Sequence, residues 1–339
     1  MGEQISGRPF IQVARGNQIE SVHDIAAHAV DAQGQVLLSF GNVDAPVYLR
    51  SSAKPFIAAA ALMAGVREQF DLRPLEVAIM AASHSGEPFH IDAVRSILRK
   101  IDVDEGALKC GSDLPYSDAA RCALAEQGSA PAAIYNNCSG KHAGILALCK
   151  AIGADTKTYL EPDNPAQQRI LQFCAQISGK TLEELPIAVD GCGIPVYAVP
   201  LRNAALSYIR YATLTGIDAT AAHALKIVRD AMIAFPEYMS GTGEFDAALI
   251  RVYDGRLVCK GGAEGVHALA IIDPAIALVI KVIDGNERAR PPAVLSALAA
   301  IGAISATQLS DLDVFAFPAV KNRAGRIVGA IRPLEWTRA

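Results

Sequence analysis

Two residues three positions apart, Ser51 and Lys54, could supply a nucleophile and the base that activates it. Residues at this spacing share one face of a helix, so the two side chains can meet. A serine hydroxyl is a weak nucleophile until a base takes its proton, and burial or a second cation can lower the pKa of a lysine enough for that role. An almost wholly apolar run over residues 52–64 follows, with Gly65 just past it, and predicts a buried helix. Alone, however, Ser-x-x-Lys more often marks a helix N-cap serine beside a solvated lysine.

A second serine and a second lysine occur in two later segments. Ser83 lies in a compact polar run at residues 82–86, Ala-Ser-His-Ser-Gly, between apolar stretches. Lys260 opens the run Lys-Gly-Gly-Ala-Glu-Gly at residues 260–265, where small residues let a substrate lie against the backbone of a strand. The order of the three segments is similar to that in penicillin-recognising hydrolases. The second and third segments depart from Ser-Asp-Asn and Lys-Thr-Gly, which argues against β-lactam chemistry itself.

Both ends of the chain predict strands, and the middle predicts helices. Hydrophobic alternation and turn residues indicate strands at residues 19–30, 36–40, 247–253, 257–260, 275–283 and 326–331. Helical spacing or composition indicates helices at residues 91–101, 117–127, 142–152, 165–178, 219–235 and 293–301. We therefore predict a mixed α+β fold, in which an antiparallel sheet is built from both chain ends and a helical region is inserted between them. Residues 1–339 would form a single catalytic unit, with 1–50 and 240–339 in the sheet region and 51–239 in the mainly helical region.

Composition excludes several classes of protein. Hydrophobic residues make up 51% of the 339 residues and charged residues 19%, so the chain is too apolar for intrinsic disorder. A net charge of −4 offers no basic surface for a phosphate backbone, so we expect no nucleic-acid partner. The longest strongly apolar stretch, residues 56–66, is about half of the ~20 residues that a membrane span needs, and residues 1–10 contain no signal-peptide core. We expect a cytoplasmic protein with no membrane partner.

Five short segments in one order resemble the rhizobial-type L-asparaginase family. They are Arg-Ser-Ser-Ala-Lys-Pro-Phe at 50–56, Ala-Ser-His-Ser-Gly-Glu at 82–87, Asn-Cys-Ser-Gly-Lys-His-Ala at 137–143, Asp-Gly-Cys-Gly-Ile-Pro at 190–195 and Gly-Ala-Glu-Gly at 262–265. The resemblance covers essentially the whole chain. It implies a serine β-lactamase-like fold, related to that of serine-type glutaminases, and hydrolysis of L-asparagine to L-aspartate and ammonia. It also implies two Ser–Lys pairs, Ser51 with Lys54 and Ser83 with Lys260.

Three further residues, Cys138, Lys141 and Cys192, lie in glycine-flanked loops. Their spacing does not itself indicate zinc, and two buried thiols with a surface lysine would explain it as well. The resemblance implies that these three residues bind a zinc ion near the active site. We expect such a metal to modulate affinity, with no cofactor required for the chemistry. The other five of the seven cysteines are predicted to lie in the core: Cys110, Cys122, Cys149, Cys174 and Cys259.

An asparagine substrate carries an α-carboxylate and an α-ammonium group. Arg50 is the nearest candidate for the carboxylate, because a guanidinium can bind it with two parallel hydrogen bonds. Asp190, and then Glu264, are the candidates for the ammonium group. Each of the three residues could instead take part in an ordinary salt bridge.

The predicted chemistry is a two-step acyl transfer. Ser51 attacks the amide carbon while neutral Lys54 accepts its proton, and backbone N–H groups at Ser51 and on the Gly262 strand hold the oxyanion. Ser83 and Lys260 relay a proton to the departing ammonia, although a role as the base for Ser51 fits this second pair equally well. The alternatives are a glutaminase or a β-lactam-type serine hydrolase on the same fold, or a non-catalytic amino-acid-binding sensor. A homodimer is the default assembly for such an enzyme.

Overall fold

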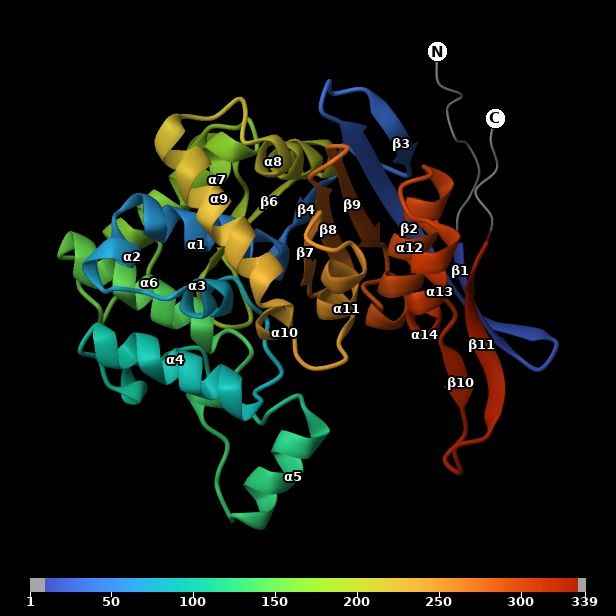
Figure 1. Ribbon diagram of the computed structural model, residues 1–339, viewed down its shortest axis with the longest axis horizontal. Coiled ribbons are helices and arrows are strands. Elements are labelled where there is room, and N and C mark those ends of the chain that lie inside the picture. Colours follow the sequence, from blue (N-terminus) through green and yellow to red (C-terminus); the bar gives the residue numbers. More distant parts are fainter. Residues whose placement is uncertain (1–9, 335–339) are drawn as a thin grey trace.

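The computed structural model describes residues 10–334. The segment at residues 1–9, which entered the prediction of location, lies outside the described residues. A twisted antiparallel sheet occupies one side of the molecule and a cluster of helices the other (Figure 1). Within residues 10–334, no helix is both long enough and apolar enough to cross a membrane.

The large sheet combines strands from the two ends of the chain. Its strands are β1 (Phe10–Arg15), β2 (Gln18–Asp31), β3 (Val36–Phe40), β7 (Leu257–Gly262), β8 (Val266–Ile271), β9 (Ile276–Val282), β10 (Ala319–Lys321) and β11 (Ile327–Pro333). Their order is β10-β11-β1-β2-β9-β8-β7, with β3 also paired to β2, and every pairing is antiparallel. This arrangement confirms the predicted α+β class, with an antiparallel sheet from both chain ends and a helical region inserted. Because β7 ends the row, Lys260 lies at an edge of the sheet.

Helices cover both faces of the sheet at its centre. β8 and β9 are buried along almost their whole length, which requires a layer on each face. α8 (Leu201–Thr213) packs against β2, β8 and β9. α12 (Arg290–Ala300) packs against β1, β8, β9 and β11, and is followed by α13 (Ala306–Asp311) and α14 (Asp313–Ala316). The central strands of the sheet are therefore enclosed by helices on both faces.

The helical part surrounds one central helix, α1 (Lys54–Met63). Its other helices are α2 (Val66–Gln69), α3 (Pro74–Met80), α4 (Pro88–Lys100), α5 (Asp118–Glu126), α6 (Ser139–Ile152), α7 (Pro165–Ile177), α9 (Ala219–Ala234) and α10 (Pro236–Met239). α1 is buried on nearly all sides and packs against α3, α6, α7 and α9. This confirms the buried helix predicted from the apolar run. Gly65, with a left-handed φ of 78°, follows its end as expected.

Two features of the chain differ from the sequence prediction. Residues 247–253 were predicted to form a strand, but residues 247–252 belong to α11 (Phe245–Val252), so that prediction was wrong. A short apolar run has the same composition in a buried helix and a buried strand, and here packing against β7 and α10 decides for the helix. A second sheet, in the order β4-β6-β5, also enters the mainly helical region; its strands are β4 (Pro46–Tyr48), β5 (Ile187–Val189) and β6 (Pro195–Pro200).

Candidate active site

Ser51 lies where the chain turns sharply from β4 into the helical part. The preceding residue, Arg50, has a left-handed backbone conformation with φ 51°, which costs a residue with a side chain about 1–3 kcal/mol. A short 3₁₀ helix, Arg50–Ala53, carries Ser51 and leads directly into α1. Such strain persists only where the surrounding structure enforces it, and here it adjoins the predicted nucleophile. Ser51 lines a cavity between the large sheet and the helices.

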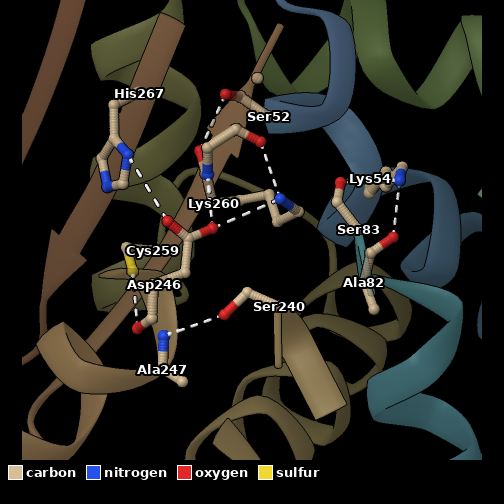
Figure 2. Close-up of polar contacts among 12 residues, drawn as sticks. Ser52, Lys54, Ala82, Ser83, Ser240, Asp246, Ala247, Cys259, Lys260 and His267 are labelled. Carbon is tan, nitrogen blue, oxygen red and sulfur yellow. Dashed lines mark hydrogen bonds and ion pairs between the residues drawn. The ribbon is translucent and has the colours of Figure 1, made fainter. Parts of the chain in front are cut away.

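Lys54 is the first residue of α1, and its side chain is buried. Its nitrogen Nζ donates hydrogen bonds to Ser83 Oγ, 2.8 Å away, and to the carbonyl oxygen of Ala82, 2.6 Å away (Figure 2). Burial disfavours the charged form and lowers the pKa of Lys54 to about 8. A substantial fraction of Lys54 is therefore neutral in mildly alkaline solution, in the form that can accept a proton.

Ser83 is held by the loop that follows α3. Its backbone N–H donates to the carbonyl oxygen of Met239 at 3.0 Å. The neighbouring His84 is buried, with Nε2 2.8 Å from Ser139 Oγ and Nδ1 accepting the backbone N–H of Gly86 at 3.2 Å. Burial also keeps the pKa of His84 well below its ordinary value, so the ring is neutral. The histidine therefore supports the loop that positions Ser83.

Lys260 reaches the same region from β7. Its buried side chain donates to the carbonyl oxygen of Gly261 at 2.7 Å and lies 3.4 Å from Asp246 Oδ2 (Figure 2). Asp246 comes from the first turn of α11 and also accepts the backbone N–H of Gly261 at 2.8 Å. Ser52 donates to the carbonyl oxygen of Lys260 at 2.8 Å. This last bond ties the edge of the sheet to the turn that carries Ser51.

Gly262 lets β7 approach that turn closely. A Cβ atom on Gly262 would lie 2.7 Å from the carbonyl oxygen of Leu49 and 2.9 Å from Ser52 Oγ. Only glycine fits there without a shift of the backbone. We expected the small residues at 260–265 to let a substrate lie against the strand. Gly262 also lets the strand lie close to the turn that carries Ser51.

The structure brings the four predicted catalytic residues into one region. Ser51, Ser83 and Lys260 line the same cavity, and Lys54 lies directly behind Ser83. The observed Ser–Lys hydrogen bond joins Lys54 to Ser83. Within residues 10–334, none joins Ser51 to Lys54, and none joins Ser83 to Lys260. The pairing in the reaction therefore stays a prediction.

The cavity has a volume of about 480 Å³, which suits a small polar ligand. Several lining residues were not indicated by the sequence patterns: Tyr116, Ser240, Glu244, Phe245, Asp246, Glu287 and Arg290. Glu244 and Asp246 lie next to the segment at residues 247–253, whose sequence predicts a strand. Arg290 is followed by two prolines, which indicate only the start of a helix. No local pattern connects any of these three to Ser51. Burial raises the pKa of Glu244.

The residues predicted to bind the substrate lie outside this lining. Arg50 Nε is 2.7 Å from Asp190 Oδ1, and the pair borders a separate narrow space together with Lys54 and Lys141. Glu264 is exposed in the turn between β7 and β8, with φ 64°. Contacts of these three residues with a substrate stay predictions. For Arg50 and Asp190, the structure shows the salt bridge that was the alternative.

Cys138, Lys141 and Cys192 come together in a buried cluster, with Lys141 Nζ 2.8 Å from Cys192 Sγ. A hydrogen bond from Cys192 and the nearby Lys141 lower the pKa of the Cys138 thiol well below its ordinary value. Two sulfur donors, one of them favoured as a thiolate, fit a zinc ion. The nearby Cys138 and Cys192 raise the pKa of Lys141, so the ion would have to displace the lysine proton in order to bind its nitrogen. Of the other five cysteines four are buried, whereas Cys122 is exposed on α5, which projects from the body (Figure 1). The prediction that Cys122 lies in the core was wrong, because α5 buries little besides Leu124.

Comparison with protein families matches L-asparaginase II over residues 11–333, nearly the whole chain. A match of this extent first places the chain in a family of hydrolases. More specifically, the chain belongs to the L-asparaginase II family. This confirms the family predicted from the five short segments.

Some solved structures are distantly similar to this chain. The native form of a protein called Mglu has a TM-score of 0.43 and 15% identity, over 84% of this chain and 66% of that one. The L-glutamate binding form of Mglu has a TM-score of 0.42 and 14% identity, over 82% of this chain and 59% of that one. This chain therefore spans less than two thirds of the length of these two Mglu chains. Simvastatin Synthase (LovD) from Aspergillus terreus has a TM-score of 0.30 and 13% identity, over 76% of this chain and 86% of that one. Comparison with curated proteins gives no match. Likeness at this level assigns no activity to the chain.

Proposed function

We propose that the protein is an L-asparaginase that hydrolyses L-asparagine to L-aspartate and ammonia through an acyl-enzyme on Ser51. The observation that carries the proposal is the 2.8 Å contact of Lys54 Nζ with Ser83 Oγ, at the wall of a cavity that Ser51 and Lys260 also line. A buried lysine with a pKa of about 8 beside serine hydroxyls suits activation of a nucleophile. Membership of the L-asparaginase II family supports an amide as the substrate.

In the first half-reaction, Ser51 Oγ attacks the amide carbon and its proton passes to neutral Lys54. Because Lys54 donates to Ser83 Oγ, we infer that Ser83 carries this proton, giving its own to Lys54 as it takes the one from Ser51. The tetrahedral intermediate then collapses as Lys54 returns a proton to the leaving nitrogen, and ammonia departs. A water molecule attacks the acyl-enzyme with the same proton path and releases L-aspartate and Ser51.

Lys260 and the backbone of β7 support the negative charge that develops on the carbonyl oxygen. We propose the backbone N–H groups of Ser51 and of the Gly262 strand as the oxyanion donors, each contributing about 3 kcal/mol if well aimed. Lys260, ion-paired with Asp246, adds a cation to the same wall of the cavity. In the alternative path, Ser83 and Lys260, in place of Lys54, relay the proton to the departing ammonia.

The charges on the cavity wall suit a free amino acid. Arg290 supplies a cation for the α-carboxylate, while Glu244 and Glu287 supply carboxylates for the α-ammonium group. Because burial raises the pKa of Glu244, an arriving ammonium group would favour its ionised form. Arg50 and Asp190, the candidates from the sequence for the same two substrate groups, pair with each other, and Arg290 likewise pairs with Glu287 at 3.2 Å. Arg290 and Glu244 line the catalytic cavity, whereas Arg50 and Asp190 border the separate narrow space, so we favour Arg290 and Glu244 as the substrate-binding residues.

A zinc ion, if bound next to this site, would be held by Cys138, Lys141 and Cys192. It would supply positive charge near Lys54, because Lys54 and Lys141 border the same narrow space, and nearby positive charge favours a neutral lysine. Nucleophile, base and hydrogen-bond donors all come from the chain, so we propose that the acyl transfer itself requires no cofactor.

The direct test of this function is ammonia release from L-asparagine and from L-glutamine, each with and without a chelator. We expect release from L-asparagine, with weaker release from L-glutamine, because one methylene changes transition-state binding by about 1–3 kcal/mol. We expect the chelator to change the affinity for L-asparagine more than the turnover. Release from L-glutamine alone would identify a glutaminase, and hydrolysis of a chromogenic cephalosporin alone would identify a β-lactam hydrolase. Binding of L-asparagine without turnover would identify a sensor.

We also propose that the protein is a homodimer in the cytoplasm, since closed two-fold dimers are the commonest assembly of enzymes of this kind. Light scattering after size exclusion should then give about twice the protomer mass of 35.7 kDa. A mass equal to that of one protomer would contradict the dimer, and recovery of the native protein outside the cytoplasmic fraction would contradict the location.

A further inference from the structure

Three buried side chains of metal-binding type lie together behind Lys260. They are Asp246 from α11, Cys259 from β7 and His267 from β8. One ligand atom from each residue lies within 4.8 Å of the other two. Figure 2 shows Cys259 and His267 beside Asp246, on the side away from Ser83 in that view. The cluster shares no residue with the group of Cys138, Lys141 and Cys192.

The polar atoms of this cluster are incompletely satisfied. Within residues 10–334, neither ring nitrogen of His267 has a hydrogen-bond partner, and neither does Asp246 Oδ1. These atoms face each other, with His267 Nδ1 3.7 Å from Asp246 Oδ1, too far for a hydrogen bond. Buried polar atoms nearly always have a partner, so their concentration at one point calls for a bound ion or water.

The two oxygens of Asp246 have different roles. Oδ2 accepts the backbone N–H of Gly261 at 2.8 Å and lies 3.4 Å from Lys260 Nζ. Oδ1 is left facing His267. Metal-binding carboxylates are commonly held in this way, by hydrogen bonds to the oxygen that does not bind the metal. Burial lowers the pKa of His267 to about 3, so its ring is in the neutral form that metals bind.

We propose that Asp246, Cys259 and His267 form a second metal site, for a divalent transition-metal ion of which zinc is the best match. Sulfur, imidazole and carboxylate ligands are together typical of zinc, and three protein ligands leave a fourth position for water. Burial raises the pKa of the Cys259 thiol, so the ion must displace its proton, and binding releases that proton to solvent.

Occupation of this site would act on the active site through one shared residue. Asp246 is the ion-pair partner of Lys260, which lines the catalytic cavity. A metal ion on Oδ1 withdraws negative charge from Oδ2 and so weakens the hold of Asp246 on Lys260. The site therefore links metal supply to the electrostatics of the cavity, whatever the substrate of the enzyme is.

The test uses cobalt(II), whose bond to a thiolate absorbs in the near ultraviolet, as the probe metal. It is added to demetallated protein carrying Cys138→Ser and Cys192→Ser, which removes the other candidate site. We expect one equivalent of cobalt(II) to bind, with a thiolate-to-cobalt absorption and with release of about one proton per ion. Adding Cys259→Ser should abolish the absorption and weaken binding by about 10-fold or more. Calorimetry in buffers of different ionisation enthalpy measures both the affinity and the proton.

A second variant and a matched control keep the result interpretable. His267→Gln should weaken binding to a similar extent, and it decides the question if Cys259→Ser does not melt cooperatively. Cys174→Ser changes an equally buried thiol on α7 and should leave cobalt(II) binding unchanged. The proposal is overturned if the Cys138→Ser, Cys192→Ser protein binds no cobalt(II), or if folded His267→Gln binds it with unchanged affinity.

Discussion

Replacement of Ser51 by alanine should abolish measurable ammonia release from L-asparagine, with kcat lowered by about 10⁴–10⁶-fold. No other hydroxyl can take its place without moving, because the 3₁₀ helix Arg50–Ala53 holds this turn against β7. Loss of the nucleophile removes the acyl-enzyme itself, so the effect falls on kcat and leaves substrate binding largely intact. A coupled ammonia assay measures the rate, and mass spectrometry of quenched protein detects the acyl group on the wild type alone.

The neighbouring hydroxyl provides a matched control. Ser52 is buried, and its hydroxyl donates to the carbonyl oxygen of Lys260 without lining the cavity. Ser52→Ala should cost about 1 kcal/mol of unfolding free energy through the lost hydrogen bond. Its kcat should stay within about 10-fold of wild type. If Ser51→Ala keeps the wild-type rate, the nucleophile is misassigned, and Ser83→Ala becomes the decisive variant.

Replacement of Lys54 by methionine should lower kcat/KM by about 10²–10⁴-fold, because the base that accepts the proton is lost while the buried volume is kept. The wild-type pH profile tests the same assignment. Burial lowers the pKa of Lys54 from its ordinary 10.5 to about 8, and only the neutral amine accepts a proton. The kcat/KM of the wild type should therefore rise as the pH is raised through about 8 and level off above it. Initial rates at low L-asparagine concentration across this range measure the profile.

The control for this prediction is a lysine outside the site. Lys226 lies on α9 in an exposed ion pair with Asp230, so Lys226→Met should leave both kcat/KM and its pH profile unchanged. Thermal melting must show that Lys54→Met is folded, because the carbonyl oxygen of Ala82 loses its donor. A folded Lys54→Met protein that keeps the rising limb near pH 8 would exclude Lys54 as the base and point to Lys260.

Much of the fold follows from local sequence. The apolar run at residues 52–64 can be stable only when enclosed, so it predicts the central helix α1 without knowledge of its neighbours. Alternation and turn residues predict β2, β3, β9 and β11, since a strand with one buried face needs a two-residue period. The short motifs at Ser51, Ser83 and Lys260 also predict that a site exists, and these residues line one cavity.

The tertiary structure alone decides which groups meet in that site. Lys54 contacts Ser83, 29 positions away, and Arg50 contacts Asp190, 140 positions away. Such contacts depend on how helices and strands pack, and residue spacing carries no information about packing. Packing also decides the position of Asp246 beside Lys260. Asp246 lies in the first turn of α11, and the local sequence of this helix predicts a strand. Local sequence thus determined the elements and the chemical types of the site, while packing between distant segments determined its contacts, because the free energy of burial is shared among elements that no local pattern connects.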